Sequence, residues 1–130
     1  MSNIKSILSL IILAVQLTAC GQNNSDRLTL GKEQAQQVLK SALTDTTSNN
    51  VINSKTAIIK DSSTAITIAE TILFDIYGKK NIRQQKPYEI YHLDNYWYLT
   101  GTIPKGSLGG TFLIILDDRN SQIIKITHGK

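Results

Sequence analysis

The stretch YEIYHLDNYWYLTGTI, residues 88–103, decides the fold class of this chain. Two runs rich in aromatic and β-branched residues, 88–93 and 96–103, flank the dipeptide Asp94-Asn95. A short polar pair between two such runs is typical of a two-residue hairpin turn. The stretch therefore predicts an antiparallel β-hairpin.

Two segments before this hairpin have apolar residues at helical spacing. The first covers residues 32–43, and the second begins at a cap, Asp61 or Ser62, and runs to Tyr77. Gly78 follows directly, at the position where a helix C-terminus favours glycine. We therefore predict two helices ahead of the first strand.

Two segments after the hairpin resemble strands. Residues 111–116 and 122–128 flank a run of polar residues and predict a second hairpin. Two helices thus precede four strands, with no alternation of strand and helix. This order predicts an α+β fold in which the helices pack on one face of an antiparallel sheet.

Composition limits the function classes. The chain has 130 residues, 41% of them hydrophobic, a formal charge of +4, one cysteine and two histidines. One cysteine excludes an internal disulfide framework, and so few Cys and His residues give no reason to expect a metal or a cofactor. The charge is too low for the dense basic surface of a nucleic-acid binder, so we expect no nucleic-acid partner.

The first twenty residues have the features of an export signal. Lys5 precedes an apolar stretch, residues 7–17, that as a helix would be about 16 Å long, too short to span a bilayer. The sequence LTAC that ends at Cys20 resembles a bacterial lipobox. This resemblance implies cleavage before Cys20 and fatty acylation of that residue. The alternative is an ordinary secretory signal followed by a free thiol.

These features divide the chain into three predicted parts. Residues 1–19 form the lipoprotein signal peptide, and residues 20–56 form the lipidated cysteine, a polar tether and a short amphipathic helix. Residues 57–130 form the folded domain. The protein is then expected in the cell envelope, on the periplasmic face of the outer membrane if the host is Gram-negative, with its lipid in the membrane.

Several short motifs follow one another in the second half of the chain. They are Thr64-Ala65-Ile66, Ile68-Ala69-Glu70, Tyr77-Gly78, Pro87-Tyr88, Trp97, Gly101-Thr102-Ile103-Pro104, Gly109-Gly110-Thr111 and His128-Gly129-Lys130. Their order and spacing resemble those of the bacterial nuclear transport factor 2-fold immunity proteins. The resemblance covers about residues 57–130. It implies a cone-like α+β fold and a protein that neutralises a toxin from a neighbouring cell, with no catalytic residues to carry over.

Structural roles explain the motif residues taken one at a time. Gly78 ends a helix, Pro87 fixes the start of an edge strand, and Trp97 is a core aromatic residue. Alternation places Trp97 and Leu99 on one strand face and Tyr96 and Tyr98 on the other. We assign structural roles to Tyr77, Gly78, Pro87, Trp97, Gly101, Gly109 and Gly110.

Three surfaces are candidates for binding a partner. The segment 79–86 carries four cations and no acid, and it is expected to be a solvated loop. A face left bare by the helices would expose tyrosines, and the glycine-rich loop 104–110 would let a partner's backbone approach closely. The candidate residues are Lys79, Lys80, Arg83, Lys86, Tyr88, Tyr96, Tyr98 and Lys105.

Two histidine–aspartate pairs, His92 with Asp94 and His128 with Asp117, are candidates for acid–base groups. Asp94 falls in the predicted turn near His92, and His128, the possible partner of Asp117, is expected to fray near the chain end. No nucleophile, base and orienting group converge. The loop 104–110 also lacks the residue order of a phosphate-binding loop. We therefore expect no catalytic activity.

The sequence as a whole favours an envelope-tethered immunity lipoprotein that blocks a protein toxin stoichiometrically. Its partners would be that toxin and, through the lipid, the membrane. The basic charge argues against a nuclease target, because nuclease inhibitors are commonly acidic. One alternative is a periplasmic lipoprotein of the same fold that binds or converts a small molecule between helix and sheet. Another is a structural envelope lipoprotein.

Overall fold

The computed structural model describes residues 27–45 and 50–129. The predicted signal peptide over 1–19 and the predicted lipid site at Cys20 lie outside the described residues. No helix within the described ranges is long and apolar enough to cross a bilayer.

The chain divides into two compact units, residues 1–41 and 42–130. Helix α1, Gly31–Thr44, lies mainly in the first unit, and it is the helix predicted over residues 32–43 with one more residue at each end. None of its residues is buried. The second unit contains every other helix and strand of the described residues.

Helix α2, Ser62–Tyr77, begins and ends at the residues that the sequence indicated. Asp61 is its N-cap, and its carboxylate accepts a hydrogen bond of 2.8 Å from the backbone N–H of Thr64. That bond, with others from the Ser63 and Thr64 hydroxyls, lowers the pKa of Asp61. Gly78 ends the helix at φ 85°, a conformation that favours glycine.

The segment expected to be a basic loop contains a helix instead, so this prediction was wrong. Helix α3 spans Lys79–Arg83 and starts directly after Gly78. Ile82 is fully buried and holds this short helix on the core, while the Ile82 N–H donates to the Gly78 carbonyl. Burial of this one apolar residue among the cations gives the short helix a contact with the core, and short helices depend on such packing.

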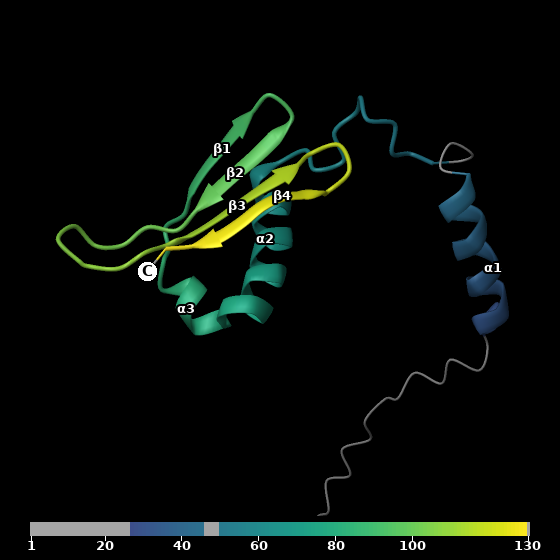
Figure 1. The fold of residues 1–130 in the computed structure, drawn as a ribbon, viewed down its shortest axis with the longest axis horizontal. Coiled ribbons are helices and arrows are strands. Elements are labelled where there is room, and N and C mark those ends of the chain that lie inside the picture. The colour runs from purple at the N-terminus through teal and green to yellow at the C-terminus, as the bar shows by residue number, and fades with distance from the viewer. Residues whose placement is uncertain (1–26, 46–49, 130) are drawn as a thin grey trace, which may run out of the picture. The chain divides into compact units, whose positions relative to one another are not determined.

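The four strands form one antiparallel sheet in the order β1-β2-β3-β4 (Figure 1). Both predicted hairpins are present, and Asp94 adopts φ 52° in the first turn. A register shift between Ile115 and Leu116 marks a bulge against the last strand. The fold is α+β, as predicted. The strands are β1 Glu89–Leu93, β2 Tyr96–Thr100, β3 Phe112–Asp117 and β4 Ile123–His128.

Helix α2 packs on one face of this sheet, and the core lies between them (Figure 1). The helix contributes small residues, Ala65 and Ala69, together with Leu73. Trp97 is 8% exposed, and its indole N–H donates to the carbonyl of Ile59 over 2.9 Å. The remaining buried apolar residues are Ile59, Ile82, Leu99, Phe112, Ile114 and Leu116.

A polar contact also joins α2 to the chain just before β1. The Tyr88 hydroxyl donates to Glu70 over 2.9 Å, and the Lys86 ammonium lies 2.7 Å from the same carboxylate oxygen. Desolvation alone would raise the pKa of Glu70, but the hydrogen bonds from Lys86 and Tyr88 outweigh it and lower that pKa. Burial and the bond to Glu70 raise the pKa of Tyr88.

Two motif glycines lie where the chain has no room for a side chain. A Cβ on Gly101 would overlap the side chain of Gln85, which accepts a hydrogen bond from the Phe112 N–H. A Cβ on Gly110 would overlap the backbone of Gly129. Both positions therefore require glycine so that segments can approach closely near the ends of the strands.

Truncating the buried side chain of α2 tests the position of the core. Leu73→Ala should lower the free energy of unfolding by about 2–5 kcal/mol, because it leaves a cavity against the sheet. Ile76, 54% exposed on the same helix, is the matched control. Ile76→Ala should change stability by no more than about 0.5 kcal/mol in the same urea titration. Equal losses would contradict this packing.

The Glu70 contact predicts a pH dependence. Because the folded-state pKa of Glu70 is lowered, its contribution is present above the unfolded pKa and is lost as pH falls through the folded pKa. Glu70→Gln should therefore cost about 1–2 kcal/mol at neutral pH, and the cost should vanish in acid. Glu89→Gln, on the exposed edge strand, is the control. A loss independent of pH would show that the charge of Glu70 does not stabilise the fold.

Candidate functional site on the outer face of the sheet

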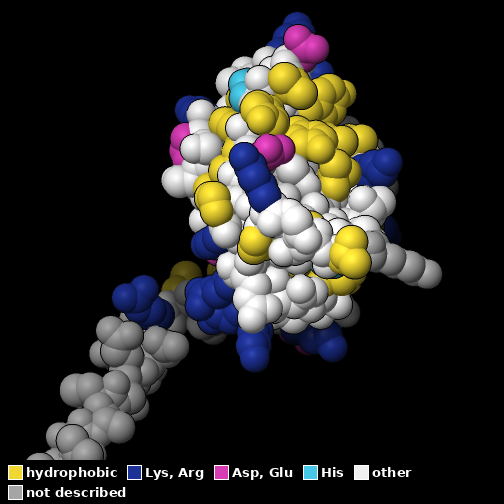
Figure 2. Space-filling view, turned by 90° about the vertical axis from the view of Figure 1, so that its left-hand side faces the viewer, with side chains coloured by type: hydrophobic (Ala, Val, Ile, Leu, Met, Phe, Trp, Pro, Cys, Tyr) yellow, Lys and Arg dark blue, Asp and Glu magenta, His cyan; other side chains and the backbone are white. Residues whose placement is uncertain are grey.

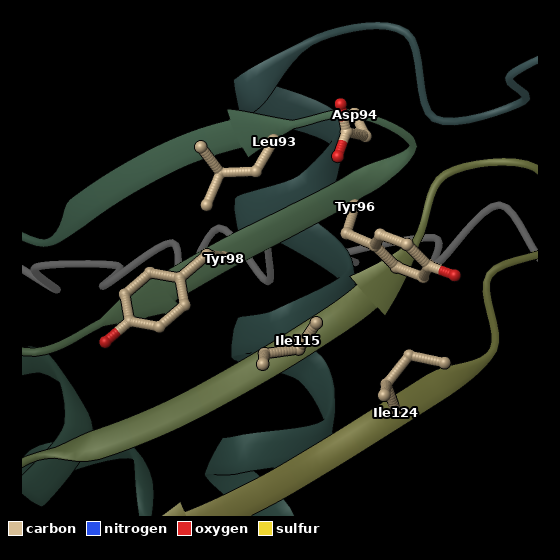
Figure 3. Close-up of a pocket in the computed structure, with 6 residues that line it drawn as sticks. All are labelled: Leu93, Asp94, Tyr96, Tyr98, Ile115 and Ile124. Atoms are coloured by element: carbon tan, nitrogen blue, oxygen red, sulfur yellow. The ribbon is translucent and has the colours of Figure 1, made fainter.

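The face of the sheet turned away from α2 carries apolar and aromatic side chains. Figure 3 shows six residues projecting from this outer face, with α2 behind the strands. Strand alternation places Tyr96, Tyr98 and Ile115 there, because their neighbours Trp97, Leu99, Ile114 and Leu116 point into the core. The outer-face residues are Leu93, Asp94, Tyr96, Tyr98, Ile115 and Ile124.

These six residues line a groove of about 320 Å³ on the outer face. Leu93 is 57% exposed and Ile124 is 49% exposed, although both are large aliphatic residues. Tyr91 extends the surface along β1, where its ring centroid lies 6.1 Å from that of Tyr98. Figure 2 shows apolar side chains gathered in one patch at the upper right of the molecule. A contiguous patch of this kind is typical of a protein-binding surface.

The groove has a charged rim that the protein itself holds in place. The Arg119 guanidinium lies over the ring of Tyr96, with 5.7 Å between its Cζ atom and the ring centroid, and its Nη2 atom lies 2.6 Å from Asp117 Oδ2. Hydrogen bonds from Arg119 lower the pKa of Asp117 and so keep the pair charged. Lys125, paired with Ile115 across the sheet, adds a second cation to this face.

The inner face of the sheet offers no comparable space. Leu73, Leu99, Phe112, Ile114 and Leu116 fill the region between α2 and the sheet, and each is at most 1% exposed. A small-molecule site requires a concave pocket with converging polar groups. Among the described residues, apolar side chains occupy that position instead.

The structure brings together only some of the candidate binding residues. Tyr96 and Tyr98 share the outer groove, but the expectation that Tyr88 joins them was wrong. Tyr88 has the same strand parity as the inward Ile90, and its ring packs edge-on against Phe112 at 5.1 Å. Lys86 forms an ion pair with Glu70 of α2 and does not belong to the groove.

The other candidate cations lie away from the groove. Lys79, Lys80 and Arg83 are exposed on α3, and the first and third lie over the ring of Phe74 at 5.9 and 5.5 Å. Lys105 is exposed in the connection between β2 and β3. The binding residues that the sequence predicted therefore lie on at least three separate parts of the second unit.

Sequence reasoning missed five residues of this surface. Asp94 was expected in the hairpin turn and as a possible partner of His92, not as a binding residue. Tyr91 and Leu93 were detectable, because the two-residue turn pairs them with Tyr98 and Tyr96. Ile115 follows from alternation in β3 in the same way. Ile124 gave no such signal, since it lies at the bulge, where an extra residue changes which side chains face outward.

His92 has a different partner from the one considered in the sequence. Its Nε2 atom lies 2.7 Å from Asp118 Oδ2, not beside Asp94, and its ring centroid lies 4.5 Å from the ring centroid of Trp97. Asp118 is only 2% exposed. Its second carboxylate oxygen has no hydrogen-bond partner among the described residues.

Asp118 also organises the backbone around it. Its carbonyl accepts hydrogen bonds from the N–H groups of Ile58 and Ile59, at 2.7 and 2.9 Å, and its own N–H donates to the Asn95 carbonyl. The residue therefore joins the segment before α2 to the first hairpin turn. These backbone hydrogen bonds and the contact with His92 give Asp118 a structural role in the fold.

His128 does not fray, so that expectation was also wrong. It pairs with Phe112 in the sheet, and its Nε2 atom lies 3.0 Å from the buried Gln85 amide. Its ring centroid lies 5.0 Å from that of Tyr77. Asp117 is bound to Arg119 instead. Across residues 27–45 and 50–129, no three His, Cys, Asp or Glu side chains form a possible metal site.

The His92–Asp118 contact predicts a stability effect. His92→Ala should lower the free energy of unfolding by about 1–3 kcal/mol, because it leaves a buried carboxylate without its side-chain partner. In an Asp118→Asn background the same substitution should cost less, since a neutral amide is cheaper to leave buried. A double-mutant cycle in urea measures the difference. Equal costs in both backgrounds would argue against a coupled pair.

Comparisons with known proteins agree with this architecture. The family model of the NTF2 fold immunity proteins matches residues 64–130. The uncharacterized protein YhhH of Escherichia coli strain K12 is 32% identical over 74 residues, which cover 56% of this chain and 58% of that protein. The uncharacterized protein YbbC of the same strain is 30% identical over 73 residues, which cover 55% of this chain and 60% of that protein.

This chain therefore spans less than two thirds of the length of these curated relatives. No solved structure gives a significant match. The family match includes α2 from Thr64 onward, α3 and all four strands, and so it covers the outer face and every buried core residue except Ile59. The resemblance seen in the sequence is confirmed: the chain belongs to the NTF2 fold immunity protein family.

Proposed function

We propose that this protein confers immunity by binding a protein toxin stoichiometrically through the outer face of its sheet. The observation that carries the proposal is the exposed apolar groove beside Tyr96 and Tyr98, on a sheet whose opposite face is filled by the core. The family membership supports an immunity role, and an immunity role requires a toxin as partner.

Aromatic side chains make this face suitable for a tight complex. Tyrosines bury a large area with few rotatable bonds, and they are enriched among the residues that dominate binding energy. Tyr91, Tyr96 and Tyr98 lie on two adjacent strands, so they present a semi-rigid surface. A standard interface of about 800 Å² per partner would extend beyond the groove to the Arg119 rim.

The cations that lie away from the groove are suited to raising the rate of association with a toxin. Lys79, Lys80 and Arg83 on α3, with Lys105 in the β2–β3 connection, add positive potential to the second unit. Complementary charge accelerates encounter more than it strengthens a complex. The toxin would then present an acidic surface, which is not what a nuclease offers near its phosphate-binding site.

Envelope tethering completes the proposal. The lipobox at Cys20 supports lipid attachment after removal of residues 1–19, with 20–56 as the tether and 57–130 as the binding domain. Two or three acyl chains anchor a protein stably, whereas one chain binds a membrane only marginally. A protein held outside the cytoplasm meets only toxins that act in the periplasm or on the membrane or wall.

A binding role also agrees better with the geometry than catalysis or ligand capture. The space between α2 and the sheet, where the alternative function needs a polar pocket, holds buried apolar side chains. His92 contacts the Asp118 carboxylate and the tilted ring of Trp97, and neither of these groups is a nucleophile of the Ser, Cys or Thr type. We therefore propose a non-enzymatic protein with no cofactor.

Survival under attack by a toxin-bearing sibling strain tests this function. Tyr98→Ala should weaken toxin binding by about 2 kcal/mol, roughly thirty-fold in affinity, and should reduce survival. Lys60→Ala, at an exposed position before α2, is the control and should protect as the wild type does. Emission of the single Trp97 would confirm that both variants fold. Full protection by a folded double variant, Tyr91→Ala with Tyr98→Ala, would reject the outer face as the binding surface.

The same assay separates tethering from binding. Cys20→Ala should abolish protection while leaving the affinity for the toxin unchanged, because it removes the anchor and not the groove. Unchanged protection by Cys20→Ala would remove the lipid anchor from the proposal. Deletion of the whole protein without loss of survival would remove the immunity role.

A further inference from the structure

Helix α1 carries an apolar stripe that nothing in the family match explains. Its apolar residues recur at helical spacing, and the largest of them are exposed: Val38 at 57%, Leu39 at 59% and Leu43 at 74%. Leu28 and Leu30 precede the helix and are 91% and 72% exposed. The family match begins at residue 64, so α1 lies outside the conserved fold model.

A helix of this length needs a surface to pack on. Helices shorter than about 12–15 residues are marginal in water, and most helical stability in proteins comes from packing an amphipathic face. Helix α1 has 14 residues, none of them buried. Its stripe consists of Ala35, Val38, Leu39, Ala42 and Leu43, while Glu33, Gln37 and Lys40 lie on the other side.

The position of α1 in the chain identifies that surface. Gly31 follows Cys20 by eleven residues, which span at most about 40 Å when fully extended. If Cys20 carries lipid, α1 is confined to the immediate neighbourhood of the bilayer. This confinement gives even a weak membrane helix a high effective concentration at the surface.

The composition of α1 favours the plane of the interface over a spanning position. Leu and Val form one side, and Lys, Glu and Gln form the other, with low net hydrophobicity, as in helices that lie at the boundary between headgroups and acyl chains. Lys40, on the polar side, is suited to anionic headgroups near such a surface.

We propose that α1 lies in the membrane interface, with its Val38–Leu39–Leu43 stripe in the acyl boundary of the leaflet that holds the Cys20 lipid. This inference rests on the lipid anchor of the proposed function. The protein would then have two membrane attachments, the acyl chains and α1, and residues 45–56 would be the effective tether of the binding domain. The reach of that domain from the membrane is shorter than a tether of residues 20–56 would allow.

Single thiols on the two sides of α1 test this placement. A lipidated Cys20 is a thioether and cannot react with a maleimide, so Leu39→Cys and Gln37→Cys would each carry one fluorophore. The full processed lipoprotein is purified in detergent and reconstituted into vesicles of phosphatidylethanolamine and phosphatidylglycerol. Lipid-borne nitroxide should quench the label at residue 39 several-fold more than the label at residue 37, and aqueous iodide should show the opposite order.

A second pair of cysteine variants controls for an effect that is specific to one substitution. Val38→Cys and Glu33→Cys lie on the apolar and polar sides, and they should repeat the same contrast. Equal quenching of both sides by iodide would overturn the proposal, because α1 would then lie in water. Protection from iodide at residue 39 without quenching by the nitroxide lipid would also overturn it, since the stripe would then pack on protein.

A chain without lipid on Cys20 would give a different result in the labelling experiment. If Cys20 is not acylated, the unsubstituted chain itself reacts with the maleimide, and it does not float with the vesicles. That result would reject the tether of the proposed function, and with it the basis for an interfacial helix. Normal acylation with no contrast between residues 37 and 39 would reject only the placement of α1.

Discussion

The close packing of α2 on one face of the sheet is the constraint on which the rest of this structure depends. Ala65 and Ala69 bring the helix near the strands, and Leu73 fills the space above Leu99 and Ile114. A four-stranded sheet has two faces, and α2 supplies apolar cover for one of them. The sheet therefore buries one set of alternating residues and presents the other set, including Tyr96 and Tyr98, at the surface.

Polar contacts at the ends of the strands hold this arrangement in register. Asp118 joins the segment before α2 to the first hairpin, and Gln85 joins α3 to the start of β3 through the Phe112 N–H. Each of these side chains is at most 5% exposed. Buried polar groups of this kind are costly when unpaired, so they favour one geometry over alternatives. The strands that form the outer groove are thus held by the core on their inner face and by polar contacts near their ends.

The two faces of the sheet differ in their surroundings. The inner face is filled by the core, and the outer face carries exposed apolar and aromatic side chains. Histidine and aspartate are present, but His92 and Asp118 engage each other in the framework, and Asp117 holds Arg119 over Tyr96. The family membership supports an immunity role for the domain.

The sequence by itself determined α1, α2 and the four strands, because caps, turns and periodicity are local: Asp61 and Gly78 bound α2, and Asp94 marks the first turn. It also determined that Trp97 and Tyr98 face opposite sides. Only the tertiary structure decided what depends on distant contacts. Ile82 converts a basic segment into a helix by reaching the core, Tyr88 turns inward to Glu70, and His92 meets Asp118 across 26 positions. The physical reason is that burial and pairing between distant segments arise only when the sheet and α2 come together, and no local pattern encodes them.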